Sequence, residues 1–250
     1  MAGSKTYRVL ATVLDKTKLK ETDLILTLLL EDGRQVGAVA KGARKPGSRL
    51  SARCELFCSV DVLLARGRNL DIVTQADLIE APLGSAPSYE ATCSASAIAE
   101  IAKHCSFEDA KDPFVSAITR KALTYVGSEE LTEPHRDLIV AAYVFKLLSH
   151  VGYRPDFSGC VYCGDHALTH FSAVAGGMLC SSCAASVAGA EQVDSNTVEW
   201  FRSLISCTFD GLASSSVDAS TAVVLLANAH VWAVTHLDCR LRAFEFLLGR

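Results

Sequence analysis

The sequence lacks the long apolar runs that would place it in or across a membrane. Residues 1–10, MAGSKTYRVL, have no apolar core of the kind that a secretory signal contains. The longest stretch free of Asp, Glu, Lys and Arg is residues 219–237, and asparagine, histidine and Ser/Thr side chains interrupt it. A bilayer span of roughly 20 residues is more uniformly apolar. We therefore predict a buried helix over 219–237, no membrane partner and a cytoplasmic location.

Aromatic side chains are almost absent from the first eighty residues, which contain only Tyr7 and Phe57. Proteins that bind single-stranded nucleic acid usually stack bases on aromatic rings, each worth roughly 1–3 kcal/mol. Arginine replaces such stacking only in part. Any nucleic-acid binding by these residues is therefore predicted to be mainly electrostatic, tolerant of sequence and sensitive to salt.

One stretch of the first eighty residues contains no acidic residue. The whole sequence has a net charge of −4, but residues 1–80 have thirteen Lys/Arg against ten Asp/Glu, whereas residues 81–250 have eleven against eighteen. The opposite net charges, +3 and −7, suggest two parts with different partners. Between Gly33 and Cys54 there is no acid, and the bases are Arg34, Lys41, Arg44, Lys45, Arg49 and Arg53. Such a basic block on mobile backbone makes nucleic acid a candidate ligand, with an ordinary solvated surface as the alternative.

The first eighty residues are predicted to form strands. The segments rich in apolar and β-favouring residues are 7–14, 23–30, 35–42, 55–65 and 69–80. A basic segment with glycine and proline, residues 41–53, forms a long loop before the fourth strand. Five strands with this spacing fit an OB-fold barrel, and an SH3-like barrel fits nearly as well.

Beyond residue 80 the pattern changes. Residues 81–88, APLGSAPS, form a predicted linker, and the following apolar residues have helical spacing. Helices are predicted to start near residue 89, at Pro113, at Pro134 and after Asp194, with two more from about residue 218 to the end. The predicted fold class is α+β, with a barrel domain at 1–80 and a helical domain at 89–250.

A four-cysteine motif interrupts the helical domain at residues 158–185, here called the cysteine insert. Cys160 and Cys163 form one Cys-x-x-Cys pair, and Cys180 and Cys183 form the other after sixteen residues. With no export signal, disulfides are disfavoured. The spacing is typical of a structural zinc site, whose four thiolates leave no open position for a water nucleophile. One structural Zn²⁺ is predicted.

Other kinds of site fit the motifs less well. A zinc deaminase requires an H-x-E triplet and a proline before its cysteine pair, and a thioredoxin-like site needs one pair rather than two. His166 and His170 lie between the pairs and are alternative ligands, although surface positions are favoured. Ser48 stands where a P-loop requires lysine, so nucleotide hydrolysis is not indicated.

The combination of these motifs resembles the bacterial recombination mediator family RecO. Residues 11–57, from ATVLDK to CELF, resemble that family's OB domain. HVGYRPDFSGCVYCG and FSAVAGGMLCSSC resemble the segments that carry its two zinc pairs. The resemblance therefore covers the barrel and the cysteine insert, and the remaining helices agree in length and order.

The resemblance implies a protein of DNA repair and recombination that is not an enzyme and works at the nucleoid. It implies binding of single- and double-stranded DNA, strand annealing and, with RecR, loading of RecA onto DNA coated with single-strand-binding protein. The implied DNA-binding residues are Lys41, Arg44, Lys45, Arg49 and Arg53, with Arg34, Arg66 and Arg68 as neighbours. For the acidic, hydrophobic tail of the single-strand-binding protein, the basic residues available in the helical domain are Arg120, Lys121, Arg136, Lys146 and Arg154.

Two features of the sequence bear on competing functions. The final residues, HLDCRLRAFEFLLGR, keep only Arg240 and Arg242 ahead of the last helix, where the family often has a basic segment, so a second DNA surface there is not expected. The alternatives to a mediator are an adaptor whose barrel binds protein, and a zinc-dependent enzyme acting on nucleic acid. The closed thiolate set disfavours the enzyme.

Overall fold

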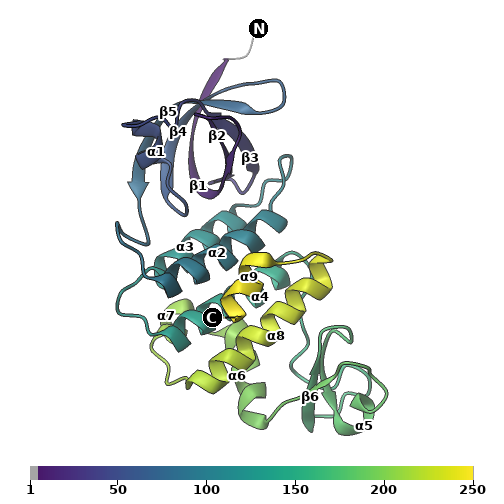
Figure 1. Ribbon diagram of the computed structural model, residues 1–250. Helices are drawn as coiled ribbons and strands as arrows, with labels where there is room; N and C mark the ends of the chain where they lie inside the picture. The colour runs from purple at the N-terminus through teal and green to yellow at the C-terminus, as the bar shows by residue number, and fades with distance from the viewer. Residues whose placement is uncertain (1–4, 250) are drawn as a thin grey trace. The chain divides into compact units, whose positions relative to one another are not determined.

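The computed structural model describes residues 5–249 (Figure 1). The chain divides into two compact units, residues 1–128 and 129–250. The first unit contains the barrel and two helices, and the second contains the remaining helices and the cysteine insert. The predicted domain division at the 81–88 linker stays a prediction.

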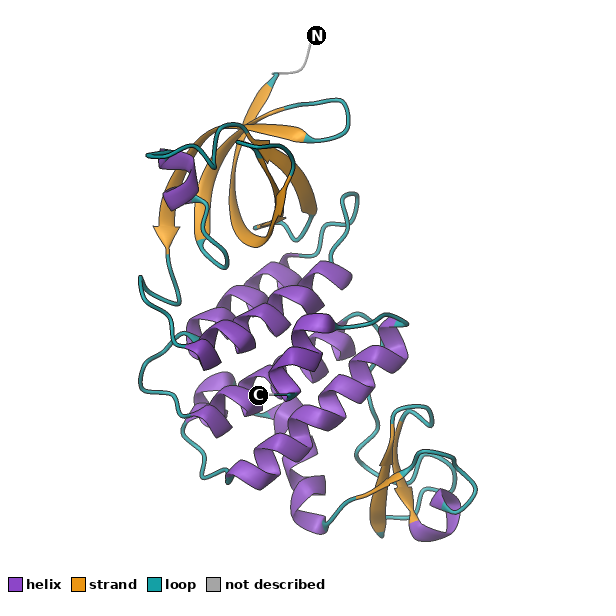
Figure 2. Cartoon of the chain, viewed as in Figure 1, coloured by secondary structure: helices purple, strands orange, loops and turns teal. Residues whose placement is uncertain are grey.

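The first unit begins with a closed five-stranded barrel (Figure 2). Its strands are β1 (Thr6–Lys18), β2 (Leu24–Leu30), β3 (Gln35–Ala40), β4 (Ser59–Ala65) and β5 (Asp71–Glu80). They pair in the order β1-β2-β3-β5-β4, with β4 returning to β1, and all pairs are antiparallel except β3–β5. This confirms the predicted five-stranded OB-like barrel. The end of the predicted loop differs, because residues 49–53 form a short helix, α1 (Arg49–Arg53).

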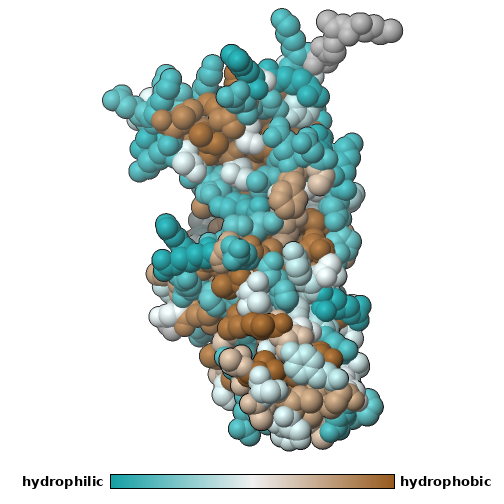
Figure 3. All heavy atoms as spheres, turned by 90° about the vertical axis from the view of Figure 1, so that its right-hand side faces the viewer, coloured by the Kyte–Doolittle hydropathy of each residue, from teal (hydrophilic) through white to brown (hydrophobic). Residues whose placement is uncertain are grey.

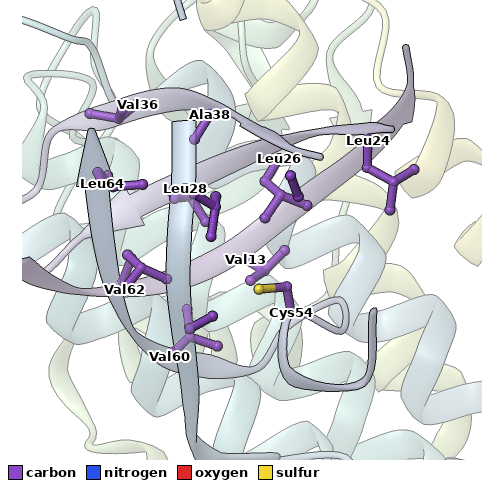
Figure 4. Packing of buried hydrophobic residues seen from close by; sticks show 14 of the residues in the cluster. Val13, Leu24, Leu26, Leu28, Val36, Ala38, Cys54, Val60, Val62 and Leu64 are labelled. Atoms are coloured by element: carbon purple, nitrogen blue, oxygen red, sulfur yellow. The ribbon is translucent and has the colours of Figure 1, made fainter. Parts of the chain in front are cut away.

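Apolar side chains that alternate along the strands fill the interior of the barrel. Leu24, Leu26 and Leu28 point inward from β2, and they meet Val60 and Val62 from β4 (Figure 4). Ile25 and Thr27 of β2, with Gln35, Gly37 and Val39 of β3, lie on the outer face, where they are half-buried. A period of two on strands of this length is what a sheet closed around a single apolar core requires.

Two helices complete the first unit, α2 (Tyr89–His104) and α3 (Pro113–Val126). The ammonium of Lys103 lies 2.7 Å from a carboxylate oxygen of Asp15 on β1. The amide of Gln35 donates to the carbonyl of Phe107, which lies between the helices. Gly33 has φ +88°, and a side chain there would lie 2.0 Å from the carbonyl oxygen of Asp112. The β2–β3 turn therefore packs closely against the α2–α3 connection.

The second unit is a helical bundle that carries the cysteine insert. Its helices are α4 (Glu133–His150), α5 (Ser181–Ala184), α6 (Ser195–Ser206), α7 (Phe209–Ala213), α8 (Ala219–Leu237) and α9 (Arg242–Leu248). Helix α4 is the most buried, and α8 packs against it. Among residues 5–249, α8 is the one helix long and apolar enough to cross a membrane. Because Leu225, Leu226 and Trp232 are buried in the bundle, the sequence-predicted core helix is confirmed.

Aromatic rings join the cysteine insert to the bundle. Phe145 of α4 is fully buried, and its ring centroid lies 5.7 Å from that of Phe157 and 6.4 Å from that of Phe171. Phe201 of α6 and Trp232 of α8 close the cluster at 5.9 and 6.0 Å from Phe145. Edge-to-face pairs of this kind add to the free energy of burial. The insert is thus held by packing as well as by its cysteines.

We expect Phe145→Ala to destabilise the second unit by about 3–5 kcal/mol, because it removes a ring from the centre of this cluster and leaves a cavity. Denaturant unfolding followed by circular dichroism measures the loss. Phe246→Ala is the matched control, since that ring is 59% exposed on α9. An equal effect of the two substitutions would contradict the central role of Phe145.

Candidate nucleic-acid interface and metal centre

The basic segment is held in place by the loop between β1 and β2 (residues 19–23). The Arg44 side chain donates from Nη1 to the carbonyls of Glu21 at 2.9 Å and Lys20 at 3.2 Å. Its backbone amide donates to the carbonyl of Thr22. The Gly42 amide donates to Asp23 at 2.8 Å, and this hydrogen bond contributes most to lowering the pKa of that carboxyl. The two loops therefore form one structure at the end of the barrel where β2 begins and β3 ends.

This contact gathers lysines that lie far apart in the sequence. Lys18 and Lys20 come from the end of β1, and Lys41 and Lys45 come from the basic segment. All four are exposed, and none has an ion pair within residues 5–249. We call them the lysine cluster. Lys18 and Lys20 are not among the DNA-binding residues predicted from the sequence, where the alternating KTKLK at residues 16–20 is their only signal.

A second basic loop, between β4 and β5, lies beside the middle of β3. Asp71 at its end pairs with Ala38, and a side chain at Gly37 would lie 2.7 Å from Leu70 of the loop. The loop carries Arg66 and Arg68, both exposed. It approaches the sheet closely enough that a side chain at Gly37 would require the Leu70 side chain to move.

Tyr7 and Asp71 fix this loop. The Arg66 guanidinium lies 5.0 Å from the centre of the Tyr7 ring, a cation–π contact. The Tyr7 hydroxyl donates to Asp71, which also accepts the Gly67 amide at 3.0 Å. Burial, followed by the contact with Asp71, raises the pKa of Tyr7 to about 12. The ring therefore stays neutral at any physiological pH and supports the arginine.

The outer face of β2 and β3 lies between these two basic loops. Thr27 pairs with Gly37 and Ile25 pairs with Val39, so these four side-chain positions share one half-exposed face. None of them is aromatic. On the face shown in Figure 3, hydrophilic residues dominate the surface of the barrel and surround a smaller apolar patch. A nucleic-acid strand on this outer face would have basic residues on two sides for its phosphates, and no aromatic ring on which its bases could stack.

The structure separates the remaining predicted DNA-binding arginines from the lysine cluster. Arg34 lies in the β2–β3 turn, at the other end of β3, where its Nε is 2.9 Å from Asp32. Arg49 is exposed on α1. Arg53 donates from Nη1 to the Ala76 carbonyl and to Asp77 of β5, both at 2.9 Å. Arg34 and Arg53 thus already have carboxylate partners. A role in DNA binding is untested for both, and for Arg53 these contacts favour a structural role instead.

We expect Arg53→Gln to leave DNA affinity and its salt dependence unchanged while lowering the melting temperature, because this guanidinium attaches α1 to β5. Fluorescence anisotropy with a labelled oligonucleotide and a thermal melt measure the two effects. A loss of affinity without a loss of stability would place Arg53 in the DNA interface.

The predicted partner-binding residues fall in different environments. Arg120 and Lys121 are exposed on α3. In the second unit Arg136 is buried, and the Lys146 ammonium donates to the carbonyls of Ile205 and Cys207, both at 2.7 Å, where burial lowers its pKa. That ammonium completes the C-terminal end of α6. Arg154 is exposed and borders, with Arg202, a cavity of about 560 Å³ whose lining includes Pro155 and Phe157.

The cysteine insert brings its four thiols together. It contains β6 (Leu168–Ser172), β7 (Gly177–Cys180) and α5, and the strand β8 (Glu191–Gln192), which lies just after it in the chain, completes a three-stranded sheet. The sulfur atoms of Cys160, Cys163, Cys180 and Cys183 lie within 4.8 Å of one another. Those of Cys163 and Cys180 are 3.7 Å apart. Tetrahedral zinc with bonds of about 2.3 Å requires roughly 3.8 Å between sulfurs, so the cluster fits such an ion.

The local backbone favours metal binding by these thiols. Burial opposes the thiolate of Cys160, but backbone amides, including that of Tyr162, lower the pKa of this cysteine to about 6. Gly164 has φ +76°, and its amide donates to the Cys160 carbonyl at 2.8 Å, closing the first turn. His166 and His170 are not members of the cluster, since they contact Ser158 and Thr169. The four-cysteine cluster is therefore confirmed as a site able to hold a metal ion.

A closed OB-like barrel joined to a helical part with a four-thiol insert is the architecture that the resemblance seen in the sequence implies. The chain belongs to the RecO family of recombination mediators, because residues 1–82 match the family model for the recombination protein O N terminal and residues 86–241 match that for its C terminal. It is 39% identical over 177 residues to the DNA repair protein RecO of Bifidobacterium animalis subsp. lactis (strain AD011), covering 70% of this chain and 72% of that protein. The family resemblance seen in the sequence is confirmed, and with it a role in DNA repair.

Proposed function

We propose that this protein binds DNA without sequence preference, anneals complementary strands and, together with RecR, helps load RecA onto DNA coated with single-strand-binding protein. One observation carries the proposal: the lysine cluster and the arginines of the β4–β5 loop border an outer face without aromatic side chains. Membership of the RecO family supports the same role.

The chemistry follows from charge. Lysine and arginine side chains neutralise phosphates and release counterions, so two strands can approach with less mutual repulsion. Because the face between the loops has no ring on which a base could stack, each strand stays free to shift until its partner is in register. Contacts of this kind favour annealing over recognition of one sequence.

The metal in this proposal is a structural zinc ion held by Cys160, Cys163, Cys180 and Cys183. Four thiolates fill its coordination sphere, so it would fix the turns of the insert and would activate no water. The proposed activity is accordingly not enzymatic. The work is done by the side chains of the barrel.

A second contact is proposed for recruitment to coated DNA in the cytoplasm. The tail of a single-strand-binding protein is acidic and hydrophobic, and Arg154 offers it a positive charge beside the apolar residues Pro155 and Phe157 of the cavity. Asp156 also lines this cavity, and Arg202 there is paired with Glu199. Phe157 accepts a hydrogen bond from Arg202 through its carbonyl, which holds that guanidinium at the border. Arg120 and Lys121 remain a second proposed place of contact.

Annealing of two bare complementary oligonucleotides across a salt series tests the proposed function. The protein is expected to accelerate duplex formation at low salt, and the acceleration is expected to fall steeply as salt rises. Folded, metal-loaded protein that accelerates nothing at any salt concentration would contradict the proposal. In that case the adaptor hypothesis would be favoured.

A further inference from the structure

Strand β1 extends beyond the end of its neighbour β2, which pairs with only part of it. Its thirteen residues pair with β4 from Thr6 to Thr12, and with β2 only from Ala11 to Lys18. Strand β2 ends at Leu30, opposite Ala11, and the chain then turns into β3. The first half of β1 therefore has β4 on one side and no strand on the other.

The directions of the backbone groups follow from the hydrogen bonds around this segment. The Lys5 carbonyl accepts a hydrogen bond from the Arg66 amide, and the Val13 amide donates to the Cys58 carbonyl, so the backbone amides and carbonyls of odd-numbered residues point toward β4. The Leu10 carbonyl accepts from the Glu31 amide, so the backbone groups of even-numbered residues point toward the side of β2. Arg8 accordingly directs its amide and carbonyl past the end of β2, where neither has a partner among residues 5–249. A free strand edge of this kind is a template for another extended chain.

A cavity lies beside this edge. It has a volume of about 670 Å³ and is lined by three residues of β1 (Arg8, Val9 and Leu10), by residues 30–32, by Asp61 and by Pro113. Leu10 is 39% exposed there. All of these residues belong to the first unit. The cavity thus occupies the place where β2 would continue if it were longer, and its lining is largely apolar.

The charges around the cavity favour a basic occupant. Glu31 is exposed and has no ion pair within the described residues. The other two carboxylates of the lining already have partners, since Asp61 pairs with Arg8 at 3.0 Å and Asp32 pairs with Arg34 at 2.9 Å. Glu31 is therefore the carboxylate left for a charge-assisted hydrogen bond with a cationic side chain of an occupant.

We propose that the first half of β1 binds an extended segment of a partner protein, in which apolar side chains alternate with lysine or arginine. The segment adds a short strand to β1 beyond the end of β2. Its backbone hydrogen-bonds to the amide and carbonyl of Arg8, its apolar side chains cover Leu10 and Pro113, and a cationic side chain pairs with Glu31. This is β-strand addition, with affinity from main-chain hydrogen bonds and specificity from alternate side chains.

The test uses the full chain and two blocked pentapeptides, Val-Lys-Val-Lys-Val and Val-Glu-Val-Glu-Val, with hydrogen exchange of single amides as the readout. With the lysine peptide at about ten times its Kd, exchange of the Arg8 amide is expected to slow about tenfold. The Val9 amide, which faces β4, is the internal control and should not change. Glu31→Gln should weaken the effect, and Glu191→Gln, which changes an exposed acid of β8 in the second unit, should not.

Three outcomes would overturn the proposal. They are equal slowing by both peptides, no slowing at roughly millimolar lysine peptide, and slowing that rises with protein concentration when no peptide is present. The last would assign the edge to a second copy of the chain. Because the lysine cluster takes no part in this contact, DNA binding by Glu31→Gln stays unchanged, and the result is independent of the proposed function.

Discussion

Changing Lys20, Lys41 and Lys45 together to glutamine is expected to weaken DNA binding roughly a hundredfold at about 0.1 M salt. For single strands the logarithm of the affinity changes by about 0.7 per phosphate contact for each tenfold change in salt, so three lost contacts lower the slope by about 2. The three ammonium groups come from two loops that Arg44 holds together. The slope, measured by anisotropy between low and high salt, therefore counts the contacts directly.

The choice of residues separates binding from folding. All three lysines are exposed and have no ion pair within residues 5–249, so the stability of the variant should change by less than about 0.5 kcal/mol. The matched control is Lys111→Gln with Arg120→Gln and Lys121→Gln, which removes the same charge from the α3 region of the same unit. An equal loss in both variants would show that net charge, and not the lysine cluster, governs binding.

Replacing Cys163 and Cys183 together by serine is expected to abolish metal binding, from one zinc ion per chain to none. Structural zinc contributes roughly 10–16 kcal/mol of apparent binding free energy in zinc-finger peptides, and that contribution is lost with the ligands. Amides of the cysteine insert should then exchange rapidly. Helices α4 and α8 should keep their protection, because Phe145, Phe201 and Trp232 pack together from α4, α6 and α8, outside the insert.

Elemental analysis and hydrogen exchange measure these two effects, and Cys54→Ser with Cys207→Ser is the control outside the cluster. DNA affinity of the metal-free variant is expected to be unchanged. A loss of affinity from protein whose barrel is still folded would contradict a purely structural ion. It would indicate that the insert itself contacts DNA.

Much of the fold could be predicted because local patterns determine it. Apolar and β-favouring residues mark all five strands, and Pro113 and Pro134 mark the starts of two helices. The spacing of the cysteines predicts their cluster, because two short Cys-x-x-Cys turns can face each other across a hairpin. Helix α1 was missed, since five residues in a basic, glycine-containing segment carry little helical signal.

The candidate site was predicted less completely, because pairing between distant residues decides which charges are free. Lys20 joins the lysine cluster only through the bonds of Arg44 to the β1–β2 loop. Arg53 is partnered by Asp77, twenty-four residues later. Lys146 is held by carbonyls at the end of α6. The positions of the basic residues in the sequence do not reveal any of these contacts.

The central claim is that the lysine cluster lets this protein bring together two DNA strands that are already covered. The most direct measurement is annealing of complementary oligonucleotides, each coated beforehand with the cognate single-strand-binding protein, by the unaltered protein and by the triple glutamine variant. We predict annealing by the first that falls with salt, and its loss in the variant. Equal annealing by both, or none by folded and metal-loaded protein, would contradict the account.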